Sequence, residues 1–295
     1  MRRLIVLGLG AVLALALSVG AVAAGSKTAT FTNYSLAETT GTTCPGSSAC
    51  SNIAAEPAIR ADGAGRFFAS SENGLGGGTV AFRSTDNGLH YTTLVSPNSL
   101  SQTSDTGFAP GGGDTDLAVA PVKNANGFYN VYVASLSLAN VDVSTSTDGG
   151  ATWTLIPVTT PETLDDREWI AADGAAKVCI SYHDAPQGIT VGCSQDAGAT
   201  FAQFTSAIDV NHAFQIGENS IGNLAIDPTP HVVYQTYSAI TTAAETACAP
   251  QLGVVEGTCD YHGVYMAVST DGGATFTDYP STSTPIRRSA TGTSS

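Results

Sequence analysis

The chain has 295 residues, of which 42% are hydrophobic and only 12% are charged. It contains 11 lysines and arginines against 25 aspartates and glutamates, a formal net charge of −14 at pH 7. A nucleic-acid-binding protein needs a basic surface, and anionic lipids repel an acidic one, so the composition argues against both partners. The low charged fraction, together with 32 glycines, also argues against helical bundles and coiled coils.

The N-terminus has the pattern of a secretory signal peptide. Two arginines precede an apolar run from Leu4 to Val22, and the small residues up to Ala24 offer a cleavage site. An uncleaved membrane anchor is the alternative, because the run is almost long enough to span a bilayer. We predict a signal peptide over 1–24, a Ser/Thr-rich lead-in over 25–53, and a secreted protein with no membrane attachment after cleavage.

Six cysteines occur in the chain, and no C-x-x-C spacing of a zinc site is present. In an oxidising compartment, local disulfides are favoured over metal binding and free thiols. The sequence alone allows 15 pairings. The cysteines form three close pairs, which we predict to be disulfides: Cys44 with Cys50, Cys179 with Cys193, and Cys248 with Cys259.

An eight-residue motif, Ser-x-Asp-x-Gly-x-(Thr or His)-aromatic, occurs four times, each time between two strand-like segments. An aspartate can accept hydrogen bonds from turn N–H groups, glycine allows positive φ, and the aromatic ring can pack between sheets. The motif therefore predicts a hairpin turn. Its aspartates are expected to be structural rather than catalytic: Asp86, Asp148, Asp196 and Asp271.

Short strands surround each copy of the motif. In the third unit we expect strands near 168–173, 177–184, 189–196 and 201–208. The other units lie near 54–96, 114–158 and 222–280. Four short strands per unit, with a first strand rich in Ala and Ile, are typical of propeller blades. No amphipathic helix is expected after the signal peptide.

The four turns resemble the Asp boxes, or BNR repeats, of sialidase-like β-propellers. The resemblance covers residues 54 to about 280. It implies an all-β propeller of four-stranded antiparallel blades over 54–285. Because sialidase propellers usually have six blades, the four visible blades are expected to belong to a six-bladed ring, with 286–295 as a tail or truncation point. Related propellers also serve as sugar-binding or assembly modules.

Carboxylates gather where the inner strands of the blades are expected to begin, at one face of the propeller. Two blades carry a carboxylate pair with the same spacing before the end of the inner strand: Asp114 with Asp116, and Asp166 with Glu168. Paired carboxylates can divide the acid and base roles of glycoside hydrolysis, so these four are our catalytic candidates. The candidate substrate contacts are Arg167, Trp169 (by stacking on a sugar), Glu56, Glu218 and Tyr182.

Two other interpretations of the same carboxylates remain open. They could hold a Ca²⁺ ion through their oxygens, although no metal ligands are assigned. They could also do no more than cap turns and keep an acidic protein soluble.

The catalytic pattern of sialidases is matched only in part. Those enzymes carry an Arg-Ile-Pro segment on the first inner strand, and its arginine clamps the substrate carboxylate. Aligned on Pro57, the arginine position holds Ala55. Arg60 stands an odd number of residues further on, so we expect it on the opposite face of the strand, which leaves Arg167 as the cation of the site.

The resemblance therefore implies an exported propeller that recognises glycans without standard sialidase catalysis. One alternative is an exo-sialidase-like glycoside hydrolase. The other is a non-catalytic extracytoplasmic scaffold.

Overall fold

The structure is a computed structural model that describes residues 55–72, 78–98, 114–137, 140–158, 164–185, 188–248 and 261–281. The predicted signal peptide, the lead-in and the segment 286–295 lie outside these ranges. The predicted pairs Cys44–Cys50 and Cys248–Cys259 also fall outside the described side chains. Among the described residues, no helix is long and apolar enough to cross a membrane.

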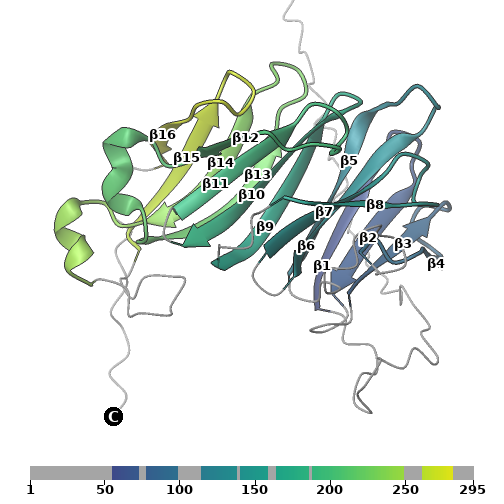
Figure 1. The fold of residues 1–295 in the computed structure, drawn as a ribbon, viewed down its shortest axis with the longest axis horizontal. Helices are drawn as coiled ribbons and strands as arrows, with labels where there is room; N and C mark the ends of the chain where they lie inside the picture. Colours follow the sequence, from purple (N-terminus) through teal and green to yellow (C-terminus); the bar gives the residue numbers. More distant parts are fainter. Residues whose placement is uncertain are drawn as a thin grey trace, which may run out of the picture. The chain divides into compact units, whose positions relative to one another are not determined.

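Four four-stranded antiparallel sheets follow one another along the chain (Figure 1). Blade 1 consists of β1 (Ala55–Ala61), β2 (Phe67–Glu72), β3 (Thr79–Ser84) and β4 (Thr92–Thr93). Blade 2 consists of β5 (Thr115–Lys123), β6 (Tyr129–Ser137), β7 (Asn140–Ser146) and β8 (Thr154–Pro157). Blade 3 consists of β9 (Leu164–Asp173), β10 (Lys177–Ala185), β11 (Gly188–Ser194) and β12 (Gln203–Ser206). Blade 4 consists of β13 (Asn219–Ile226), β14 (Val233–Ala239), β15 (Gly263–Ser269) and β16 (Thr277–Pro280).

Within each sheet the strands are hydrogen-bonded in the order in which they occur in the chain. This up-and-down order, repeated from sheet to sheet, is the architecture of a β-propeller and confirms the predicted fold class. One strand boundary differs: β9 begins at Leu164 rather than near 168. Carboxylates are uncommon in strands, so the sequence predicted that the strand begins after them. In the structure the pairing of β9 with β10 continues through Asp165 and Asp166, with a bulge at Arg167.

The inner strands β1, β5, β9 and β13 pack side by side in that order. Between neighbouring blades lie three apolar clusters, built for example around Phe68, Tyr132 and Tyr237. β11 is buried along its whole length, because blade 3 is covered on both faces. β14 alternates between buried and half-buried residues, because one face of blade 4 packs on blade 3 and the other is more open.

The four repeated motifs form turns of the same construction. In the last copy, Asp271 Oδ1 accepts from the backbone N–H groups of Ala274 (3.1 Å) and Thr275 (3.0 Å), and Oδ2 accepts from the Thr275 hydroxyl (2.6 Å). The Ser269 hydroxyl donates to Asp271 Oδ1 at 2.7 Å and accepts from Gly273 N at 2.8 Å. The donors lower the pKa of Asp271 to about 2. The aspartate therefore holds the turn together.

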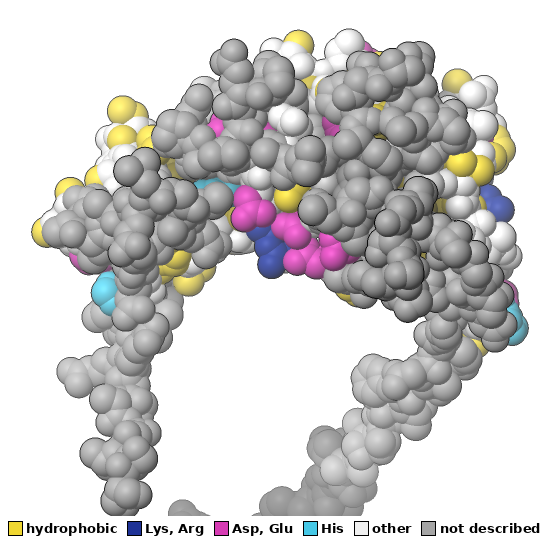
Figure 2. All heavy atoms as spheres, turned by 60° about the horizontal axis from the view of Figure 1, so that its bottom comes forward, with side chains coloured by type: hydrophobic (Ala, Val, Ile, Leu, Met, Phe, Trp, Pro, Cys, Tyr) yellow, Lys and Arg dark blue, Asp and Glu magenta, His cyan; other side chains and the backbone are white. Residues whose placement is uncertain are grey.

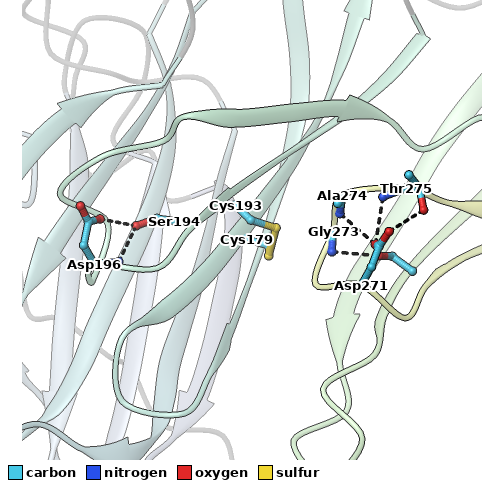
Figure 3. The surroundings of a disulfide bond; sticks show 9 residues. Cys179, Cys193, Ser194, Asp196, Asp271, Gly273, Ala274 and Thr275 are labelled. Atoms are coloured by element: carbon cyan, nitrogen blue, oxygen red, sulfur yellow. Dashed lines mark hydrogen bonds between the residues drawn. A yellow bond between two sulfur atoms is a disulfide. The ribbon is translucent and has the colours of Figure 1, made fainter.

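A disulfide joins Cys179 on β10 to Cys193 directly opposite on β11, as predicted. Figure 3 shows it between two of the repeated turns, with the Asp271 turn of blade 4 reaching toward it. A Cβ atom on Gly273 would lie 2.6 Å from Cys193 Sγ, and Gly273 has a φ of +101°. Glycine is therefore required for the turn of one blade to pack on the disulfide of the blade before it.

Two short 3₁₀ helices interrupt the β structure, whereas the sequence predicted no helix. They are η2 (Val210–Gln215) and η3 (Ala243–Cys248). η2 forms because Asp209 caps it, accepting from the backbone N–H groups of Asn211 and His212. A single turn of this kind has no apolar periodicity, so the pattern of the sequence does not reveal it.

We expect Asp271→Ala to lower the free energy of unfolding by about 1–2 kcal/mol, because it leaves several turn donors without an acceptor. Asp271→Asn keeps one acceptor oxygen and should lose less. Urea unfolding of the two variants measures the difference. Equal losses would contradict the role given to the second carboxylate oxygen.

Replacing both Cys179 and Cys193 by alanine should lower the free energy of unfolding by about 3 kcal/mol, since the bond closes a short loop. The single Cys179→Ala variant should lose nearly as much, because either change breaks the same covalent link. Urea unfolding without reductant tests this. If the double variant lost about twice as much free energy of unfolding as the single variant, the stabilisation would not come from the shared covalent link.

Candidate functional site

Two β-bulges mark the beginning of the inner strands of blades 1 and 3. Ala55 pairs with Glu72 and Ala58 with Ser70, so β1 holds one more residue than β2 over this stretch. β9 has the corresponding irregularity opposite Tyr182 and His183. The bulged residues Glu56 and Arg167 have φ values of +48° and +50°, a conformation that costs energy for any residue with a Cβ. Such bulges redirect side chains and are common beside active sites.

The side chains of the two bulged residues contact each other across blade 2, which lies between their own blades. Arg167 Nη1 donates to Glu56 Oε2 at 3.2 Å, and Arg167 Nε lies 3.6 Å from Asp114 Oδ2, just before β5. Three blades thus each contribute one side chain to this group. Figure 2 shows Asp and Glu side chains gathered beside basic side chains near the middle of this face.

The proximity of two carboxyl groups changes their protonation. Burial, a hydrogen bond with Asp114 and the negative charge of Asp114 raise the pKa of Glu56 to about 7, although Arg167 opposes the shift. Glu56 is therefore partly protonated near neutral pH. Its side chain is 33% exposed, so a ligand can reach it.

Asp116 has a different position from its neighbour Asp114. It is buried, and Oδ1 accepts from Leu117 N (2.8 Å) and from Arg60 Nη2 (3.2 Å). Oδ2 accepts from Ile170 N on β9 at 3.1 Å. The carboxylate therefore bonds blade 2 to blades 1 and 3.

The contact with Asp116 corrects the prediction for Arg60. The sequence placed Arg60 on the opposite strand face because it stands an odd number of residues from Ala55. The bulge at Glu56 inserts one residue, so the alternation of faces reverses between Ala55 and Ala58. Pro57, which is uncommon inside strands, is the sequence signal that could have indicated the bulge.

Glu168 lies deeper than the other carboxylates. Its residue is 3% exposed, and neither carboxylate oxygen has a hydrogen-bond partner among the described residues. Burial, and then the negative charges of Asp114, Asp116 and Glu56, raise the pKa of Glu168 well above its usual value. These surroundings disfavour the ionised form of the carboxyl group.

Two further carboxylates border the group. Asp166 is half-buried, and its Oδ1 accepts from Arg167 N at 3.0 Å. Burial and the charge of Asp114 raise its pKa, while Arg167 lowers it. Glu72, at the end of β2, has its pKa raised by burial and by Asp114. Sequence reasoning missed Glu72, because it lies outside the inner strands. We call Glu56, Glu72, Asp114, Asp116, Asp166 and Glu168, with Arg60 and Arg167, the carboxylate cluster.

The remaining predicted contacts lie elsewhere. Tyr182 is buried in the core between blades 2 and 3, and Trp169 packs against the core between blades 3 and 4. Glu218 precedes β13, and burial raises its pKa. The structure therefore groups all four catalytic candidates with Glu56 and Arg167, whereas Trp169 and Tyr182 contribute mainly to the cores.

A cavity of about 310 Å³ adjoins the cluster along the inner strands. Its lining comes from all four blades and is formed mostly by alanine, valine, leucine and isoleucine. Arg60 is the charged residue in this lining, and it reaches Asp116. Arg60 is therefore the residue that the cavity and the carboxylate cluster share.

Two groups of side chains bear on metal binding. The sequence suggested Ca²⁺ at the carboxylates, yet Asp114 and Asp116 lie against Arg167 and Arg60. Within the described ranges, the side chains close enough to share an ion are Asp209, His212 and Asp278 at the edge of blade 4.

No protein-family model matches the chain. No curated protein matches it either. Solved structures do resemble it: the α-L-arabinofuranosidase Arb93A of Fusarium graminearum superposes with a TM-score of 0.51 at 14% identity, over 76% of this chain and 65% of that one. The Penicillium chrysogenum α-L-arabinanase, complexed with arabinobiose, gives the same values.

The intramolecular trans-sialidase of Ruminococcus gnavus reaches a TM-score of 0.48 at 11% identity, over 81% of this chain and 73% of that one. The chain has the fold of propeller glycosidases. It spans about 65% of the length of the first two structures, and identities this low show the fold alone.

The raised pKa of Glu56 has a measurable effect on stability. An unfolded glutamate ionises near pH 4.5, whereas folded Glu56 stays protonated up to about pH 7. The folded state therefore binds more protons, and stability falls as the pH rises between these values. Glu56→Gln should remove this loss, raising the free energy of unfolding at pH 8 by about 1 kcal/mol and changing little at pH 4. Unfolding curves at both pH values test it. A stabilisation that is equal at both would point to packing instead.

Proposed function

We propose that the chain is a glycoside hydrolase that acts on uncharged glycans at the carboxylate cluster. The observation that carries the proposal is that the partly exposed Glu56, with a pKa raised to about 7, lies among carboxyl groups from neighbouring inner strands. Hydrolysis of a glycosidic bond needs a protonated carboxyl for the leaving oxygen and an ionised one opposite it.

Glu56 is our candidate for the general acid. Its pKa of about 7 keeps it partly protonated at neutral pH, and its side chain is exposed enough to touch a ligand. Asp166 is our candidate for the base or nucleophile, because it is accessible and lies beside Arg167. Asp114 raises the pKa of Glu56 and, together with Arg167, orients it.

Asp116 and Glu168 have other roles in this proposal, although the sequence suggested catalysis. The oxygens of Asp116 are engaged by Arg60 and two backbone donors. Both oxygens of Glu168 are buried. In this proposal Asp116 holds the blades together, and Glu168 is a buried carboxyl group behind the reacting ones.

An uncharged substrate is favoured by the local charge. Six carboxyl groups gather around two arginines, and each arginine already forms an ion pair with a carboxylate. No arginine of the cluster is therefore left to clamp the carboxylate of a sialic acid, and the surplus negative charge repels one. Two of the solved structures with this fold are named for arabinose-containing substrates, and one holds arabinobiose, which is uncharged.

The test is hydrolysis by the full chain of a panel of neutral aryl glycosides, including an α-L-arabinofuranoside, beside a fluorogenic sialoside. We expect turnover of a neutral glycoside and none of the sialoside. The kcat/KM should fall as the pH rises through about 7, where Glu56 loses its proton.

Two variants separate the roles. Glu56→Gln should lower kcat by about 100-fold or more on substrates with poor leaving groups and much less on a dinitrophenyl glycoside, which needs no acid. Asp166→Asn should lower kcat on both kinds of substrate. Asp196→Asn, in a turn remote from the cluster, is the matched control and should retain activity.

Absence of hydrolysis across the panel by folded protein would overturn the enzymatic proposal. If glycan-array binding persisted in that case and was lost in Asp166→Asn, the cluster would be a recognition site without catalysis. Turnover of the sialoside would overturn the specificity for uncharged substrates.

A further inference from the structure

Away from the carboxylate cluster, two aspartates at the junction of blades 3 and 4 each accept a hydrogen bond from the backbone N–H group of the other. Asp209 N donates to Asp278 Oδ2 at 2.8 Å, and Asp278 N donates to Asp209 Oδ2 at 3.0 Å. The two residues are 69 positions apart in the sequence. This reciprocal pair brings two carboxylates together and fixes their orientation.

A histidine lies between the two carboxylates. His212 Nδ1 is 2.9 Å from Asp209 Oδ1 and 3.5 Å from Asp278 Oδ2. One ligand atom from each of the three residues lies within 4.8 Å of the others. Ligands around one transition-metal ion, each about 2.0–2.2 Å from it, are separated by similar distances.

A second observation points to a missing ligand. The side chain of Asp278 is fully buried, and its Oδ1 has no hydrogen-bond partner among the described residues. The Tyr237 hydroxyl, which lies close to Asp278, donates to Gln215 Oε1 at 2.9 Å. A buried carboxylate oxygen without a donor is costly unless something else compensates it.

The site can be reached from solvent on the side of Asp209 and His212, whereas Asp278 forms its buried side. A groove of about 410 Å³ is lined by Asp209, Asn211 and Thr277, next to Asp278. The His212 side chain is 24% exposed. An ion could therefore enter from the groove and keep water as a further ligand.

We propose that Asp209, His212 and Asp278 bind one divalent transition-metal ion, with Zn²⁺ as the probe. A mixture of one imidazole nitrogen and two carboxylate oxygens favours such ions over Ca²⁺ and Mg²⁺, which prefer oxygen alone. The ion takes the place of the proton that His212 Nδ1 now shares with Asp209. Bound there, it links the end of blade 3 to β16 of blade 4. The site is independent of the carboxylate cluster.

The test uses the full chain, freed of metal with a chelator and titrated with Zn²⁺ by calorimetry and by thermal unfolding. We expect one site per chain and, at about 100 times the Kd, a rise in the unfolding midpoint of about 5–10 °C. Bound Co²⁺ should show the visible absorption bands of a site with a low coordination number and a nitrogen ligand.

Two variants test the ligands. His212→Ala should abolish the calorimetric site, the midpoint shift and the Co²⁺ band. Asp278→Asn keeps an acceptor oxygen for Asp209 N, so it should fold with a midpoint close to that of the metal-free protein, yet lower the Zn²⁺ affinity by 100-fold or more. The matched control is His231→Ala, because His231 Nδ1 bonds Asp173 Oδ2 at 2.7 Å without a third ligand nearby in the described part of the chain.

The proposal is overturned if Zn²⁺ gives no stoichiometric site, or if His212→Ala binds as well as the unaltered chain. It is also overturned if His231→Ala loses binding to the same extent, which would indicate general surface chelation. In each of these cases the three side chains form only an ion-pair contact between the blades.

Discussion

The four blades are held in place by the packing of their inner strands against one another: β1 on β5, β5 on β9, and β9 on β13. Small residues such as Ala118 and Ala171 line the shared cavity and let neighbouring strands approach closely. Apolar side chains fill the spaces between neighbouring blades, and polar side chains add hydrogen bonds from one blade to the next. Asp116 does so by accepting from Ile170 N. Because the inner strands begin at a common face, the carboxylates at their starts are brought together there.

The conformation of the site stores strain that the surrounding contacts maintain. Glu56 and Arg167 both have positive φ, which costs of order 1–3 kcal/mol for each residue. Their ion pair, together with the contact of Arg167 with Asp114, partly compensates for that cost. The bulges direct both side chains over blade 2, where a regular strand would alternate them between its two faces. The strained backbone of these two residues and the direction of their side chains thus both result from the bulges.

Acidic side chains in this protein have opposite chemistry according to where they lie. In the turns, hydroxyl and backbone donors lower the pKa of Asp196 and Asp271 to about 2, so these groups stay ionised and fasten the hairpins. At the inner strands, burial and neighbouring negative charge raise the pKa of Glu56 to about 7. A surplus of acidic residues therefore serves both as scaffold and as a source of exchangeable protons.

The blades could be predicted from the sequence, because turn chemistry and strand alternation are local properties. The Ser-x-Asp turns, the Cys179–Cys193 pair and the position of carboxylates at the starts of inner strands all follow from neighbouring residues. Contacts between blades determine which carboxylates are buried, that Arg60 reaches Asp116, and that Trp169 packs toward a core. Those outcomes depend on a one-residue bulge and on contacts between blades far apart in the chain, and neither leaves a periodic pattern in the sequence.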